Sequence, residues 1–115
     1  MDMKIYKAAC YCRLSQDDVN DGTNVSITTQ MAVAKEFCKE NKFQIVDYYC
    51  DDGYTGTNFN RPEFKRMMKD VEKGRVNLVI VKDLSRFGRE HIMVDSYTQI
   101  YFPENGVRFI AIYHI

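Results

Sequence analysis

Several side chains of this sequence are suited to chemistry on a phosphate group. One is a serine, Ser15, whose hydroxyl group is a candidate nucleophile. The others are basic and can match phosphate oxygens with N–H donors: Arg13, Arg61, Lys82, Arg86 and Arg89. Phosphoryl transfer depends on charge stabilisation around phosphorus more than on elaborate covalent machinery. If these residues meet, they predict a hydroxyl nucleophile in a phosphate site that needs neither a metal nor a cofactor.

Spacing alone also allows ordinary structural roles for these residues. Ser15 and Asp18 have the spacing of a capping box, and from spacing alone capping is the better explanation. Arg86 and Arg89 lie three residues apart, so they either face one anion together or pair with acidic neighbours at the surface. Neither of the two histidines forms a recognisable Ser/His/Asp pattern with Ser15. The phosphate interpretation therefore depends on separate segments meeting in one place.

Four nearby residues also have ordinary interpretations. Tyr11 lies in a strand-like run and is expected to be a core aromatic, whereas Gln30 lies in a predicted helix and is expected to be exposed. Gly53 and Gly56 are expected to serve as turn residues.

The composition predicts one folded domain. The chain has 115 residues, of which 45% are hydrophobic and 13% aromatic. Its formal net charge is zero, which argues against strong DNA binding through bulk electrostatics, although residues 61–92 carry nine Lys or Arg against five Asp or Glu. No stretch approaches the roughly 18 apolar residues of a membrane span, and there is no signal-peptide core, so we expect a cytoplasmic protein. The four cysteines are scattered and form no C-x-x-C pair of the kind that binds zinc.

Hydrophobic periodicity and turn residues predict alternating strands and helices. Four strands are expected, over residues 5–14, 43–50, 78–81 and 107–113. Three helices are expected, from Ser26 to Asn41, from Pro62 to Gly74, and from Ile92 to Tyr101 with a stop at Pro103 and Gly106. This alternation predicts an α/β fold with a mostly parallel sheet and helices on both faces. Because ligand sites gather beyond the carboxyl ends of parallel strands, three loops should open at one edge: 13–24, 51–61 and 82–90.

Four motifs, in this order along the chain, resemble the resolvase/invertase family of serine site-specific recombinases. The first two are Tyr11-Cys-Arg13-Leu-Ser15, similar to Y-x-R-x-S, and Ser26-Ile-Thr-Thr-Gln30, similar to the start of a family helix. The other two are the segment from Asp52 to Pro62, similar to D-x-x-x-G-x-x-x-x-R-P, and the segment from Leu84 to Arg89, similar to L-[DS]-R-[LF]-G-R. The last has the form typical of the large serine recombinases of mobile elements. The resemblance covers nearly all of the chain and implies a three-layer α/β/α resolvase-like domain around a four-stranded sheet.

The resemblance implies a role for each matching residue. Ser15 would attack the DNA backbone and form a transient 5′-phosphoserine link, from which the strand is rejoined without ATP. The scissile phosphate would be bound by Arg13, Arg86 and Arg89. Active-site support would come from Tyr11, Gln30, Asp52, Thr55, Arg61, Lys82 and Ser85, with Lys69 or Lys73 as a further basic position. Ser85 stands where many members have aspartate, and the group that takes the Ser15 proton is not evident from the sequence.

The resemblance also implies DNA as the partner and a homo-oligomer, a dimer that forms a tetramer when two DNA sites are brought together. Relatives continue into an oligomerisation helix and DNA-binding domains, so residues 1–115 are expected to be a catalytic domain truncated before them. Such a piece, with zero net charge, is expected to bind DNA weakly and not to recombine it. Two other classes stay open: a non-catalytic phosphate-binding or signalling module, and a metal-dependent nuclease or primase-like domain that uses the aspartate pairs at 17–18 and 51–52.

Overall fold

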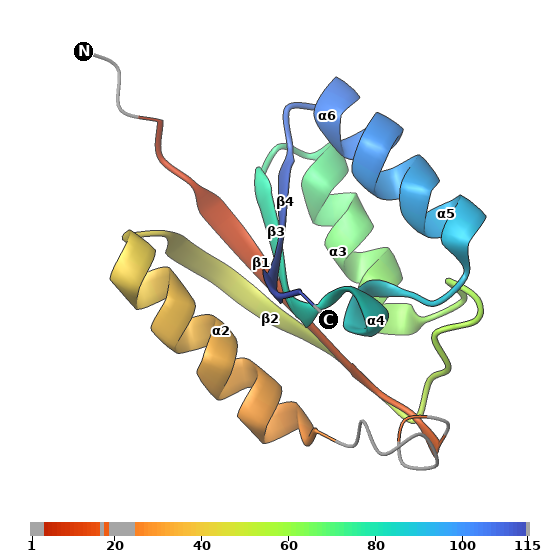
Figure 1. Ribbon diagram of the computed structural model, residues 1–115. Helices are drawn as coiled ribbons and strands as arrows, with labels where there is room; N and C mark the ends of the chain where they lie inside the picture. The colour runs from red at the N-terminus through yellow and green to blue at the C-terminus, as the bar shows by residue number, and fades with distance from the viewer. Residues whose placement is uncertain (1–3, 17, 19–24, 115) are drawn as a thin grey trace.

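The centre of the molecule is a four-stranded sheet in the order β2-β1-β3-β4. The structure, a computed structural model, describes residues 4–16, 18 and 25–114. The strands are β1 (Lys7–Leu14), β2 (Gln44–Asp52), β3 (Leu78–Asp83) and β4 (Arg108–Tyr113), and their pairings are all parallel. The helical elements are α2 (Ile27–Asn41), α3 (Pro62–Glu72), α4 (Leu84–Phe87), α5 (His91–Asp95), the π-helical η1 (Ser96–Tyr101) and α6 (Phe102–Glu104) (Figure 1).

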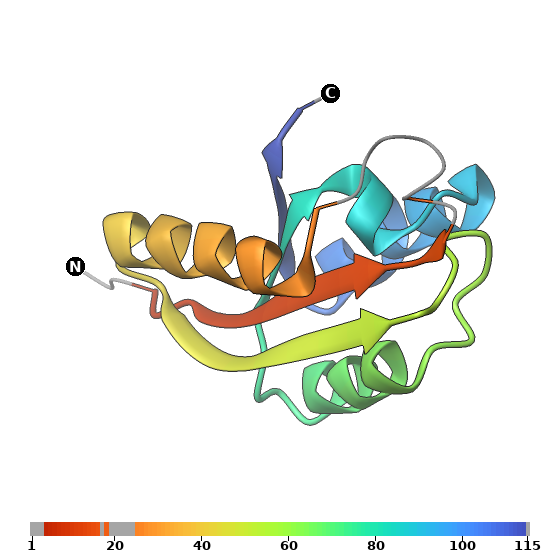
Figure 2. The same ribbon diagram turned by 90° about the horizontal axis from the view of Figure 1, so that it is seen from below.

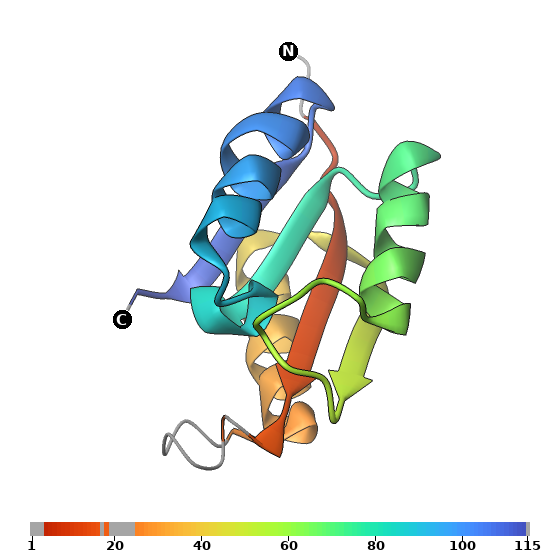
Figure 3. The same ribbon diagram turned by 90° about the vertical axis from the view of Figure 1, so that its right-hand side faces the viewer.

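Helices cover both faces of the sheet, which confirms the three-layer α/β/α fold (Figure 3). On one face α2 packs its buried residues Ala34 and Cys38 against Ala8 and Cys10 of β1. On the other face lie α3 and the continuous helical run α5–η1–α6, around a core rich in aromatic side chains. None of the helices in the described part of the chain is long and apolar enough to cross a membrane.

The ends of two helices follow the signals in the sequence. Ser26 caps α2, since its Oγ accepts a hydrogen bond from the N–H of Thr29 at 3.1 Å. Pro62 occupies the first turn of α3, where its missing N–H would in any case have no partner within the helix. After α3 the chain turns at Gly74, whose φ of 74° favours glycine.

Other boundaries differ from the predictions. β2 continues two residues past Cys50, to Asp52, and β3 ends at Asp83 instead of Val81. The segment expected to be a loop at 82–90 contains the short helix α4. The end of the last helical run agrees with its prediction, because the run ends at Glu104, between Pro103 and Gly106, and Gly106 has a φ of 69°.

The sheet opens at its carboxyl edge, between its two central strands. β1 pairs with β3 only over Ala8–Cys10, whereas β1 and β2 stay paired as far as Leu14 and Asp52. Figure 2 shows β1 and β2 pointing toward the same end of the molecule, where α4 also lies. Side chains from other elements fill the fork between β1 and β3, and they form the candidate site.

Candidate active site

Three arginines and a serine meet around the carboxylate of Asp18. Ser15 directly follows β1, Arg86 lies in α4, and Arg89 lies between α4 and α5. Arg86 and Arg89 each donate from Nη2 to Oδ1 of Asp18, at 2.6 and 2.7 Å. Arg13, near the end of β1, donates from Nη1 to Oδ2 at 3.2 Å and from Nη2 to Oδ1 at 3.5 Å. The structure thus brings together the four residues to which the resemblance gives the main catalytic roles.

Ser15 is held against the same carboxylate. Its Oγ donates to Oδ2 of Asp18 at 2.9 Å, and its backbone N–H donates to the same oxygen at 2.7 Å. Nη1 of Arg13 in turn donates to the Ser15 hydroxyl at 3.4 Å. The hydrogen bond from the Ser15 N–H to Asp18 is one half of a capping box. The capping role that the spacing predicted for Ser15 and Asp18 is therefore partly confirmed. It does not compete with the phosphate interpretation, because the hydroxyl also faces the arginines.

Burial and neighbouring charges shift the pKa values of Arg13 and Asp18 in this cluster. Arg13 is fully buried, and its burial, with the nearby charge of Arg86, lowers the pKa of its guanidinium to about 10 against the opposing effect of Asp18. The group remains charged at neutral pH. Burial alone would raise the pKa of Asp18, but the hydrogen bonds from Ser15 and the charges of Arg13 and Arg86 outweigh it and hold that pKa below its ordinary 3.8. The Asp18 carboxylate therefore lies among three guanidinium cations, one of which, Arg86, also pairs with Asp83 at 3.7 Å.

Gln30 is buried, not exposed as its helical position suggested, because it binds the main chain of Arg13. Its Oε1 accepts from the Arg13 N–H at 3.1 Å, and its Nε2 donates to the Arg13 carbonyl at 2.9 Å. Nη1 of Arg86 donates to the same carbonyl at 3.0 Å. These side chains take the place of the strand partner that β3 does not supply beyond Cys10.

Ser85 and Asp83 hold two of the arginines in place. The Ser85 carbonyl accepts from Nη2 of Arg13 at 2.6 Å, and its hydroxyl accepts from Nη2 of Arg86 at 3.2 Å while donating to Asp83 at 2.5 Å. Lys82 belongs to the same neighbourhood through Asp83, to which it donates at 3.1 Å. Ser85 is thus in contact with the arginine cluster, and Lys82 reaches it through Asp83.

Gly56 is more than the turn residue that the sequence suggested. A Cβ at this position would lie 2.8 Å from Nη2 of Arg13 and 2.9 Å from Cγ of Arg89. Its carbonyl also accepts from the backbone N–H of Arg89 at 2.7 Å. Only a residue without a side chain lets the loop after β2 approach the two arginines so closely.

We expect Gly56→Ala to lower the free energy of unfolding by about 1–3 kcal/mol, because buried Arg13 has no room to move away from the new methyl group. Urea unfolding followed by circular dichroism would measure this change. Gly53→Ala in the same loop is the comparison variant, since it adds backbone strain at a φ of 90° but meets no atom within 4 Å and therefore measures strain without crowding. An unchanged free energy of unfolding in Gly56→Ala would contradict this account of the close approach.

A second buried network lies behind the first. The hydroxyl of Tyr11 donates to Oδ2 of Asp51 at 2.8 Å and accepts from Nη1 of Arg61 at 3.0 Å. The same Nη1 donates to the carbonyl of Phe87 at 2.7 Å, at the end of α4. Tyr11 and Arg61 therefore fix the segment that carries Arg86, and they act on the arginine cluster through the backbone.

Asp51, and not its neighbour Asp52, supplies the buried carboxylate of this network. Because β2 runs on to Asp52, the two side chains point to opposite faces, and Asp51 is 2% exposed whereas Asp52 is exposed. Asp51 also accepts hydrogen bonds from the N–H groups of Glu63 and Phe64, both at 3.0 Å. It thereby caps α3 from a separate strand. The structure places Asp52, which the resemblance singled out, outside this network.

We expect Asp51→Ala to lower the free energy of unfolding by about 2–4 kcal/mol. The substitution leaves the Tyr11 hydroxyl and two N–H groups at the start of α3 without their hydrogen-bond acceptor. Asp52→Ala is the control, expected to change this energy by less than about 0.5 kcal/mol. Chemical denaturation of both variants tests the assignment. Equal losses in the two would contradict it.

The remaining predicted positions lie as follows. Thr55 is half-buried beside Gly56, and its hydroxyl accepts from the N–H of Thr57 at 3.2 Å. Lys69 and Lys73 are exposed, and Lys73 adjoins Gly74, whose carbonyl binds Lys7 at the start of β1, at the edge of the sheet opposite to the site. Asp17 and the predicted turn at 21–22 lie outside the described residues. Within the described ranges, no three His, Cys, Asp or Glu side chains gather as metal ligands would.

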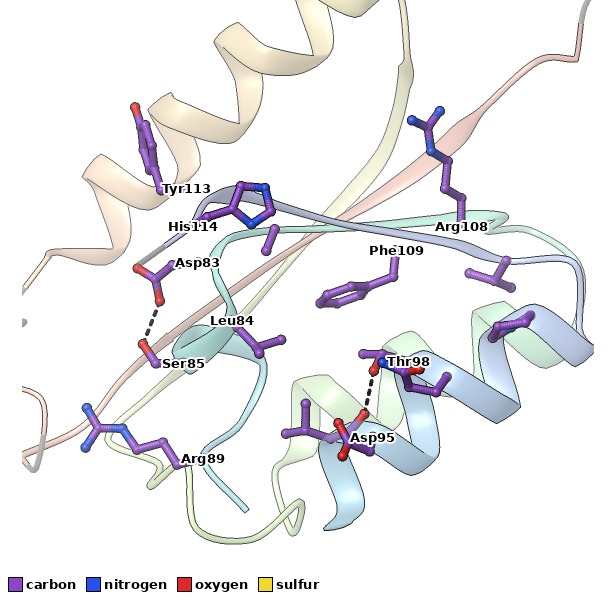
Figure 4. Close-up of a pocket in the computed structure, with 15 residues that line it drawn as sticks. Asp83, Leu84, Ser85, Arg89, Asp95, Thr98, Arg108, Phe109, Tyr113 and His114 are labelled. Carbon is purple, nitrogen blue, oxygen red and sulfur yellow. Dashed lines mark hydrogen bonds between the residues drawn. The ribbon is translucent and has the colours of Figure 1, made fainter. Parts of the chain in front are cut away.

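A groove of about 800 Å³ adjoins the arginine cluster. It lies between β4 and the α5–η1 helix, with Phe109 facing its interior (Figure 4). Ser85 and Arg89 form one end, and the guanidinium of Arg89 points away from Phe109. Neither Ser15 nor Arg13 lines this groove, so the candidate chemistry lies beside it.

Several solved structures resemble this fold. The N-terminal catalytic domain of TP901-1 integrase superposes with a TM-score of 0.81 and 27% identity, over 91% of this chain and 75% of that one. A resolvase family site-specific recombinase from Streptococcus pneumoniae gives a TM-score of 0.73 and 34% identity, over 95% of this chain and 72% of that one. The C-terminal catalytic domain of ISC1926 TnpA, an IS607-like serine recombinase, shares the fold with a TM-score of 0.77 at 20% identity, over 94% of this chain and 68% of that one.

Sequence comparison agrees with these structures. Residues 8–114 match the family described as Resolvase, N terminal domain. No curated protein sequence matches the chain. Because the family match spans nearly the whole chain and the structural neighbours are catalytic domains of the same kind, the chain belongs to the resolvase N-terminal domain family and is the catalytic domain of a serine site-specific recombinase.

Proposed function

We propose that Ser15 is the nucleophile of this recombinase and that Arg13, Arg86 and Arg89 bind the phosphate it attacks. One observation carries the proposal: all three guanidinium groups and the Ser15 hydroxyl bind a single oxyanion, the carboxylate of Asp18. A phosphodiester is also an oxyanion with a charge of −1, and it can accept the same donors.

The reaction would proceed by in-line displacement. Ser15 Oγ forms a bond to phosphorus and loses its proton, while the bond from phosphorus to the 3′ oxygen of DNA breaks and that oxygen gains a proton. The DNA 5′ end is left joined to Ser15. The arginines neutralise the charge that collects on the equatorial oxygens, which is where the transition state needs it. Attack by a 3′ hydroxyl on the phosphoserine reverses the steps and rejoins the strand.

The setting of this reaction is part of the proposal. Recombination acts on two DNA sites, so we propose that dimers of the complete protein pair as a tetramer around them. We further propose that residues 1–115 make up one catalytic domain and that the protein acts in the cytoplasm. The zero net charge of this chain supports the view that other segments supply most of the affinity for DNA.

A small activated phosphodiester tests the nucleophile without knowledge of the DNA target. In thymidine 5′-(p-nitrophenyl phosphate), attack by Ser15 would release p-nitrophenolate and leave thymidine 5′-phosphate joined to the serine. We expect release of nitrophenolate at 405 nm together with a thymidylyl group that tandem mass spectrometry assigns to Ser15. A thymidylyl group on any other side chain of the folded protein, with Ser15 unmodified, would refute the proposal.

A further inference from the structure

Asp18 lies where a substrate phosphate would have to bind. Its side chain is fully buried, and its two oxygens take up donors from Arg13, Arg86 and Arg89. Its Oδ2 also lies 2.9 Å from the Ser15 hydroxyl. For attack, phosphorus must come within about 3–3.5 Å of that hydroxyl. The carboxylate fills this space, so both anions do not fit among the donors at once.

The exchange of one anion for the other is nearly balanced in charge. A carboxylate and a phosphodiester each carry one negative charge at neutral pH, and each presents oxygens to the same three cations. If the carboxylate left without replacement, buried Arg13 would lose its ion pair and Arg86 would keep only the longer one with Asp83, at 3.7 Å, which is costly. The cluster is therefore stable with Asp18 bound or with a phosphate bound, and unstable with neither.

We propose that Asp18 is a built-in competitor of the DNA phosphate: it occupies the arginine cluster until a phosphodiester displaces it, and Ser15 attacks only after that exchange. This inference rests on the proposed function, since it assumes that the arginines bind the substrate phosphate. It assigns to Asp18 a regulatory role that neither the capping spacing nor the resemblance suggested.

The close contact between Asp18 and Ser15 is also one that a general base would make, but the surroundings of Asp18 argue against that role. A useful base needs a proton affinity near the working pH. The hydrogen bonds from Ser15 and the charges of Arg13 and Arg86 lower the pKa of Asp18, which makes this carboxylate a weak base. In its present position it also excludes the phosphorus atom that the serine would attack.

Phosphate binding to Asp18→Asn tests the competition directly. The amide has a similar shape but no charge, so the arginines lose their resident anion. In HEPES and sodium chloride we expect this variant to melt below wild type, and phosphate at matched ionic strength to raise its melting temperature by about 5 °C or more. Calorimetric titration should show phosphate binding at least about tenfold tighter than in wild type.

Glu72→Gln is the charge-matched control, since Glu72 is an exposed residue at the end of α3. It should behave as wild type with phosphate. An equal phosphate response in all three proteins would overturn the inference, because it would show that Asp18 does not compete with phosphate. An equal gain over wild type in both variants would also overturn it, because loss of a distant negative charge would then have the same effect as loss of Asp18.

The wild-type protein provides a measurement that does not depend on the folding of the variant. As phosphate saturates the site, the 13C resonance of the Asp18 carboxyl group should move toward that of a solvated carboxylate. A resonance that stays fixed at saturation would overturn the inference, since both anions would then be bound together.

Labelling by the thymidine ester separates this inference from the proposed function. If Asp18 competes, Asp18→Asn should label Ser15 several-fold faster than wild type; slower labelling at saturating ester would overturn the inference in favour of a general base. Tighter phosphate binding by Asp18→Asn supports the competition even if no protein is labelled at Ser15, a result that would refute the nucleophile alone.

Discussion

Ser15→Ala is expected to abolish labelling by the thymidine ester, with a loss of at least about a thousandfold in rate. The hydroxyl of Ser85 also lies beside the arginines, and Ser15 and Ser85 each donate to a carboxylate. The proposed exchange with phosphate displaces only that of Asp18, so the Ser85 hydroxyl stays bound to Asp83 and does not replace the lost nucleophile. The fold should persist, because alanine removes the hydroxyl but keeps the Ser15 N–H that binds Asp18. Nitrophenolate release and intact-protein mass spectrometry measure the effect.

Ser26→Ala is the matched control for this prediction. Ser26 caps α2 through Thr29, so its loss should lower the free energy of unfolding by about 1 kcal/mol and leave labelling unchanged. If Ser15→Ala were labelled at the wild-type rate, the hydroxyl at position 15 would not be the attacking group.

Arg86→Lys should lower the labelling rate by about a hundredfold at saturating ester, although it conserves the charge. The guanidinium of Arg86 reaches the Arg13 carbonyl through Nη1, and Asp18 and the Ser85 hydroxyl through Nη2. A single ammonium group cannot occupy both positions. The Arg13 carbonyl or the phosphate would then lose its donor.

The control is Arg75→Lys, because the Arg75 side chain is 65% exposed and makes one long ion pair with Asp70. It should retain the wild-type rate and melting temperature. Equal rates for Arg86→Lys and wild type would show that a point charge suffices, and the forked geometry would then have no part in the reaction.

Most of the fold could be predicted because each local signal agreed with the global arrangement. The alternation of apolar runs with helical stripes specified parallel strands, and Ser26 and Pro62 marked helix starts that the structure reproduces. Pro103 and Gly106 likewise marked the end of the last helical run, which ends at Glu104 between them. The helix α4 within the predicted loop at 82–90 was missed, because four residues are too few to show a helical pattern of apolar side chains.

The arginines of the site could be predicted from their loops, but the anion that they share could not. Asp18 carried only a capping signal, since two of its partners, Arg86 and Arg89, lie 68 and 71 positions along the chain. Asp51 could have been found from strand alternation, because it lies on the same face as buried Tyr49. Gly56 is the glycine of the motif from Asp52 to Pro62, but its close contacts could not be predicted, since they arise from the approach of two distant side chains.

The fork between β1 and β3 has a consequence for protein engineering. In most sheets a strand end can be reinforced by extending its ladder, but here the Arg13 backbone depends on Gln30 and on Arg86. A redesign that paired β1 and β3 beyond Cys10 for greater thermostability would displace the side chains of Gln30 and Arg86. The proposed reactivity would then be lost. The same side chains support both the stability of this strand end and the proposed reaction. Directed evolution toward thermostability should therefore leave this end of the sheet unchanged.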